Sequence, residues 1–142
     1  MRWLKYKFKR HPISNQLFKE EVLNVVTHIS TLLIFSFLSG MLLLKTNYFL
    51  PSIIFCIANI NMFAASTLYH YFEDTSVKKK FQIFDHAGVN LLIASSYTPF
   101  CVFIGNYTIL VITWALTILN IATMILKKDV TSKFLLRYLV MG

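Results

Sequence analysis

The chain has 142 residues, of which 56% are hydrophobic and 14% charged, with a net charge of +8 and a mean hydropathy of +0.61. This composition excludes an ordinary water-soluble domain, in which about 25% of residues are charged. It also argues against nucleic-acid binding, because the lysines and arginines lie outside the apolar runs and no nucleic-acid motif accompanies them. An all-α, multi-pass transmembrane helical bundle is therefore predicted, with the thirteen Phe and seven Tyr supplying interfacial aromatics.

The chain begins with a basic and aromatic tail, residues 1–20, which we expect either to lie on an anionic lipid surface or to be a solvated end. Four complete apolar helices follow, and a fifth is incomplete; their predicted ranges are 22–45, 49–71, 85–104, 108–126 and 134–142. Residues 73–82 are read as a short charged loop. Cys56 and Cys101 lie within apolar runs and are expected to be small buried residues without a disulfide.

Polar side chains recur at helical spacing in these apolar segments. Glu21, Asn24 and His28 fall on one narrow face of the first helix, and Ser66 precedes His70 by one turn near the end of the second. The fourth helix carries a stripe of Thr113, Thr117 and Asn120, which we interpret as helix-packing contacts. Such groups are either interhelical hydrogen-bonding residues or, when ionisable, markers of a functional site.

The loop charges predict the orientation of the helices. All fourteen lysines and arginines except Lys45 fall in the N-terminal tail, in residues 73–82 and after the fourth helix. The positive-inside rule therefore predicts a cytoplasmic N-terminus. We expect the protein to lie in the cell (plasma or inner) membrane. Residues at the start of the first and third helices and the end of the second converge at the cytoplasmic face: Glu21, Asn24, His28, Ser66, His70, Asp85 and His86.

This convergence suits a zinc site. His70 could supply one ligand and Asp85 a carboxylate that holds a water, whereas a catalytic zinc needs three protein ligands and an open position. His28 and His86 are further candidates by depth, although neither belongs to a His-x-x-x-His pair on one helix face. A structural polar network is the alternative reading of the same residues.

Three motifs in order resemble the hemolysin III family, which is related to the progestin and adiponectin receptors and to the alkaline ceramidases. Glu21, Asn24 and His28 match the start of its first helix, and the sequence from Ser66 to His70 matches its S-x-x-x-H motif. Asp85-His86-Ala87-Gly88, followed by Ser96-Tyr97-Thr98-Pro99-Phe100, is similar to its third-helix signature. The resemblance covers residues 20–142.

The resemblance implies a seven-helix fold with a zinc site on the cytoplasmic side. In that family the histidine matching His70 ligates zinc, the aspartate matching Asp85 holds the water at zinc, and the serine matching Ser66 lies close by. The other two ligands come from an H-x-x-x-H motif in the seventh helix, which is absent from this sequence. We therefore expect a C-terminally truncated chain that is inactive alone, or one completed by a complementing chain or by homo-oligomerisation.

Three functions fit these observations. The first is a zinc-dependent membrane hydrolase that cleaves an amide bond in a lipid-like substrate. The second is a membrane-perturbing, pore-forming and cytolytic protein, which the family name suggests. The third is a non-enzymatic, receptor-like or membrane-homeostasis protein, in which the polar cluster is structural.

Overall fold

The computed structural model describes residues 9–127, which form four α-helices joined by short turns. Helix α1 spans Phe18–Lys45, α2 spans Phe49–Tyr71, α3 spans Thr75–Ile104 and α4 spans Tyr107–Lys127. No strand occurs in this part of the chain, so the predicted all-α class is confirmed.

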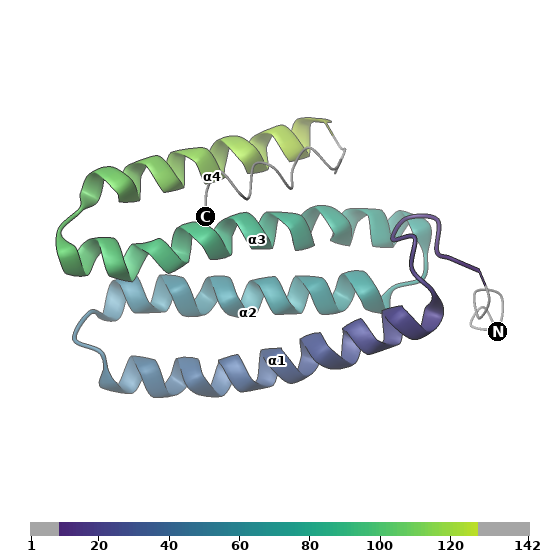
Figure 1. Ribbon diagram of the computed structural model, residues 1–142, viewed down its shortest axis with the longest axis horizontal. Helices are drawn as coiled ribbons and strands as arrows, with labels where there is room; N and C mark the ends of the chain where they lie inside the picture. The colour runs from purple at the N-terminus through teal and green to yellow at the C-terminus, as the bar shows by residue number, and fades with distance from the viewer. Residues whose placement is uncertain (1–8, 128–142) are drawn as a thin grey trace.

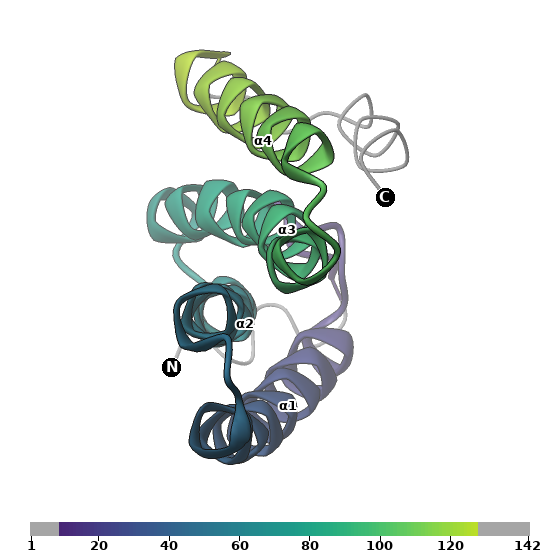
Figure 2. The same cartoon turned by 90° about the vertical axis from the view of Figure 1, so that its left-hand side faces the viewer.

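Successive helices run antiparallel, and each packs chiefly against its neighbours in chain order (Figure 1). Seen end-on in Figure 2, the four helices form one row, in chain order, and do not surround a common centre. The starts of α1 and α3 and the end of α2 therefore meet at one end of the structure. We call this the N-terminal end of the bundle.

All four helices are long and apolar enough to cross a membrane. At 1.5 Å per residue, α1 and α3 are about 42 and 45 Å long, which exceeds the ~30 Å of a bilayer core. Each of these two helices must therefore extend beyond the bilayer core at its ends or be tilted within the bilayer. Many apolar side chains of all four helices are exposed to the surroundings, as expected for surfaces that contact lipid.

The predicted range of α2 agrees with the structure. Helix α1 begins four residues earlier than predicted, and α4 is one residue longer at each end. The prediction for residues 73–82 was wrong, because α3 begins at Thr75 rather than at residue 85. Asp74 explains the early start. Its side chain accepts hydrogen bonds from the backbone N–H groups of Ser76 and Val77, which caps the first turn. The predicted fifth run, 134–142, lies outside the described residues.

Two glycines have specific roles in α3: one allows close packing against α2, and the other ends the helix. A Cβ atom at Gly88 would lie 3.1 Å from the backbone of Met62, so a larger residue would push α3 away from α2. Gly105 ends α3 with a φ of 71°, a left-handed conformation that suits glycine. Cys56 and Cys101 are buried and unpaired, as predicted.

Candidate functional site

The side chain of Glu21 links three helices at the N-terminal end of the bundle. Its Oε2 atom lies 2.7 Å from Nδ1 of His70 on α2, and its Oε1 atom lies 2.9 Å from Nζ of Lys78 on α3. The hydroxyl of Ser14 also donates a hydrogen bond to Oε1. Glu21 is only 7% exposed, so this carboxylate is held away from water by a cation and two further donors.

Lys78 is the most deeply buried charged residue of the cluster, at 1% exposure. Besides Glu21, its ammonium group donates to the main-chain carbonyl of Tyr69 at 2.9 Å. The same Nζ atom lies 4.7 Å from the centre of the Tyr69 ring, within the range of a cation–π interaction. These contacts compensate the loss of hydration that a buried ammonium group suffers.

Two more residues of the α1 polar face meet His70. The imidazole ring of His70 stacks on that of His28, with centroids 5.4 Å apart, and the side-chain nitrogen of Asn24 lies 3.5 Å from Nδ1 of His70. Asn24 also donates to the side chain of Gln16 at 2.9 Å. The predicted convergence of α1 with the end of α2 is therefore present in the structure.

The contact with Glu21 fixes the tautomer of neutral His70. A carboxylate only accepts hydrogen bonds, so Nδ1 of His70 must carry the proton in the 2.7 Å contact. Asn24, at 3.5 Å from the same atom, is then a neighbour and not a hydrogen-bond donor to it. The lone pair of the neutral imidazole is on Nε2, for which residues 9–127 provide no hydrogen-bond partner.

A tight turn before α1 covers this end of the bundle. His11 is 5% exposed, and its Nε2 atom donates to the main-chain carbonyl of Glu73 at 2.9 Å. Its Nδ1 atom accepts from the backbone N–H of Ile13 at 3.1 Å, which fixes the neutral tautomer. The turn includes Asn15 in the left-handed region, with a φ of 57°. His11 thus ties the approach to α1 to the α2–α3 connection.

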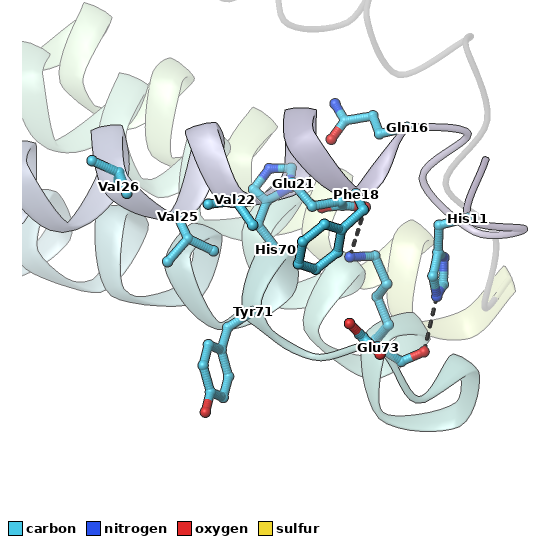
Figure 3. A pocket seen from close by; sticks show the side chains of 11 residues that line it. His11, Gln16, Phe18, Glu21, Val22, Val25, Val26, His70, Tyr71 and Glu73 are labelled. Carbon is cyan, nitrogen blue, oxygen red and sulfur yellow. Dashed lines mark hydrogen bonds and ion pairs between the residues drawn. The ribbon is translucent and has the colours of Figure 1, made fainter. Parts of the chain in front are cut away.

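A pocket of about 270 Å³ lies beside the cluster, between α1 and the end of α2 (Figure 3). Its apolar wall comes from the first turns of α1, and its polar part comes from the cluster and the α2–α3 connection. The residues that line it are His11, Gln16, Phe18, Glu21, Val22, Val25, Val26, His70, Tyr71, Glu73 and Lys78. We call it the α1–α2 pocket.

The remaining predicted site residues are less closely joined to the cluster. Ser66 is buried one turn before His70, but no hydrogen bond connects the two side chains. Asp85 lies near enough to His28 and His86 to act on them electrostatically, yet within residues 9–127 it has no hydrogen bond or ion pair of its own. Across the same residues, no group of three or more His, Cys, Asp or Glu side chains is placed to hold a metal ion.

The sequence reasoning missed Lys78 because it treated residues 73–82 as a loop. Asp74 followed by Ser76 is a helix-start signal, and a helix from Thr75 puts Lys78 and Asp85 within ~20° of one another around its axis. That pattern would have placed the lysine on the face that meets Glu21. The contributions of Ser14, Gln16 and His11 come from a folded turn, which no periodicity reveals.

These features define a multi-pass helical membrane protein with a buried cluster of ionisable side chains at one end of its helices. Residues 16–141 match the family model described as "Haemolysin-III related". The chain is 32% identical over 140 residues to the "Hemolysin-3 homolog" of Bacillus subtilis (strain 168), covering 87% of this chain and 63% of that protein. It is 34% identical over 113 residues to "Hemolysin-3" of Bacillus cereus, covering 72% and 52% respectively.

The chain therefore belongs to the hemolysin III family. It spans less than two thirds of the length of these two relatives. No solved structure matches it.

Proposed function

We propose that this protein contributes to a zinc-dependent membrane hydrolase that cleaves an amide bond in a lipid-like molecule. The observation that carries the proposal is the pairing of His70 with Glu21. Histidines that ligate metals almost always donate their other ring N–H to a carboxylate, a carbonyl or a water. Glu21 accepts from Nδ1 in this way, and the free lone pair on Nε2 is the one that a metal would take.

The residues of the chain have separate roles in this proposal. His70 would be a zinc ligand, Glu21 would hold the orientation of its ring, and Asp85 would hold a water and accept its proton. Bound zinc would polarise the scissile carbonyl and lower the pKa of the water toward ~7. Ser66 would lie behind His70. A zinc site needs two further ligands, which must come from beyond residues 9–127 or from a second chain.

The proposal includes an orientation. Lys79 and Lys80 are exposed at the N-terminal end of the bundle, together with Lys9 and Arg10. Because positive charges favour the cytoplasmic side, this end would face the cytoplasm of a cell whose plasma membrane holds the protein. The site would then act on molecules that reach it from the inner leaflet.

The test measures zinc in the protein purified from membranes in its complete natural form. We expect about one zinc per protein, lost in His70→Ala. Glu21→Gln should lower zinc affinity by about 10- to 100-fold, since it replaces the carboxylate behind the ligand. Glu20→Gln is the matched control, because Glu20 lies next in sequence but has a side chain that is 46% exposed. Zinc content that is unchanged in His70→Ala would remove the metal assignment.

The printed names of the two relatives support a second candidate, a membrane-perturbing cytolytic protein. Four helices with many exposed apolar side chains are compatible with insertion into a foreign bilayer. In this case liposome leakage should persist after zinc chelation and in Asp85→Asn. Leakage that both treatments abolish would instead favour hydrolysis.

A further inference from the structure

One carboxylate oxygen of the α1–α2 pocket has no hydrogen-bond partner among the described residues. Oε1 of Glu73 is shielded from solvent, and no group within residues 9–127 donates a hydrogen bond to it. The nearby ammonium group of Lys78 is already bound to Glu21 and to the carbonyl of Tyr69. His11 reaches only the main-chain oxygen of Glu73. A buried acceptor without a donor is costly, so this oxygen suits a ligand that donates a hydrogen bond.

The opposite part of the pocket is apolar, and part of its lining is exposed on the outer surface of α1. Val22, Val25 and Val26 form its wall on α1, and Val22 and Val26 are 41% and 56% exposed. Figure 3 places the three valines along α1, with Glu73 and His11 at the other end of the pocket. The apolar part therefore extends toward the membrane-spanning region, and the polar part lies at the end of the bundle. This polarity matches an amphiphile in a membrane leaflet.

The size of the pocket restricts the occupant further. Its volume of about 270 Å³ lies just below the ~300–1,000 Å³ that is usual for small-molecule sites. One alkyl chain with a compact head group fits such a space, whereas a two-chain phospholipid does not. The free Oε1 of Glu73 favours a head group that donates N–H bonds, and the negative charge of the carboxylate favours a cationic one.

We propose that the α1–α2 pocket binds a long-chain amine, with its ammonium group on Glu73 and its alkyl chain along Val22, Val25 and Val26. Binding of this kind requires neither zinc nor catalysis. As a statement about the substrate it rests on the proposed function: hydrolysis of an amide consumes one water and yields a carboxylate and an amine. The pocket would then receive the amine half of the molecule, next to His70.

The experiment titrates dodecylamine into the full chain in nanodiscs of zwitterionic phosphatidylcholine, followed by calorimetry, with empty nanodiscs as background. We expect saturable binding of the amine and no competition by dodecanoic acid. Glu73→Gln should weaken binding by about tenfold or more, because a charge-assisted hydrogen bond is lost. Val25→Phe should also weaken it by filling the apolar wall.

Two matched variants control for charge and bulk away from the pocket. Glu20→Gln removes an exposed carboxylate at the same end of the bundle, and Val111→Phe adds a ring at a position that is 66% exposed on α4. Both should bind dodecylamine as the unmodified chain does. The side chain of Glu73 forms no hydrogen bond with a described residue and acts on Lys78 only electrostatically, so Glu73→Gln should still fold, and its melting temperature checks this directly.

Several results would overturn the inference: uptake that does not saturate, dodecanoic acid binding as tightly as the amine, or unchanged affinity in Glu73→Gln. Zinc chelation separates this proposal from the proposed function, since it should leave amine binding unaltered. Amine binding in a protein without zinc would support the pocket alone. Zinc binding without amine binding would leave the hydrolase and remove the pocket.

Discussion

The structure contains two buried polar regions of different kinds. At the N-terminal end of the bundle, Glu21, His70 and Lys78 form an ionisable cluster that borders a pocket. Between α3 and α4, a neutral seam is centred on Asn90, which accepts from Asn120 through its side chain and from Thr117 through its main chain. The cluster lies in the first turns of α1 and α3 and the last turn of α2, whereas Asn90 lies near the middle of α3.

The difference follows from what a bilayer tolerates. Amides and hydroxyls can be buried at mid-membrane when they bond across a helix pair, and they hold helices together there. Charged groups are far more costly at that depth and are retained near the interface or at functional sites. The seam therefore has a structural role, and the cluster is the region where chemistry or binding is to be sought.

The largest expected effect in this comparison comes from breaking the ion pair of the cluster. Lys78→Met should destabilise the fold by about 3–5 kcal/mol, because it leaves the buried carboxylate of Glu21 without its cation. Reversible unfolding in mixed micelles measures the loss. The double variant Glu21→Leu with Lys78→Met should recover much of it, since neither charge then remains buried.

Lys79→Met is the control, because Lys79 is exposed on the next position of the same helix. Its effect should stay within ~0.5 kcal/mol, as for other surface substitutions. Equal losses in the Lys78 and Lys79 variants would mean that the ion pair contributes nothing to stability. The cluster would then be no more than a set of interfacial charges.

Much of the fold could be predicted from the sequence, because a bilayer-spanning helix has a strong signal of length and hydropathy. The range 49–71 shows this well, since the apolar run and the helix coincide. The first ten residues of α3 lack that signal. They include Lys78, Lys79 and Lys80 and extend α3 beyond a bilayer-spanning length, so only the Asp74 cap marks where the helix begins.

The part of the candidate site that depends on helical faces and on the antiparallel order of the helices was predicted from the sequence. Glu21, Asn24 and His28 share one face of α1, and antiparallel packing brings that face to His70. Which atom of His70 meets the carboxylate depends on side-chain packing and cannot be predicted from spacing. The α1–α2 pocket also depends on the turn before α1, whose bonds join residues distant in sequence.

A smaller effect is expected in the neutral seam. Asn90→Leu keeps a similar volume but removes the acceptor for Asn120 and the bond to the main chain of His86. The loss should be about 1 kcal/mol, in line with other interhelical hydrogen bonds in membranes. Unfolding in the same micelles measures it, and dodecylamine binding should not change. Altered amine binding would show that the two regions are coupled.

The smallest effect should come from the edge of the seam. The indole N–H of Trp114 on α4 donates to the hydroxyl of Thr98 on α3 at 3.1 Å. Trp114→Phe keeps an aromatic ring but removes the donor and some buried area, so a loss of about 0.6 kcal/mol is expected from the bond. Thr98→Val removes the acceptor, and a double-mutant cycle isolates the pair. A coupling energy near zero would mean that the bonds of Asn90 and side-chain packing hold α3 and α4 together without this bond. A coupling as large as that of Glu21 with Lys78 would contradict the distinction between a neutral seam and an ionisable cluster.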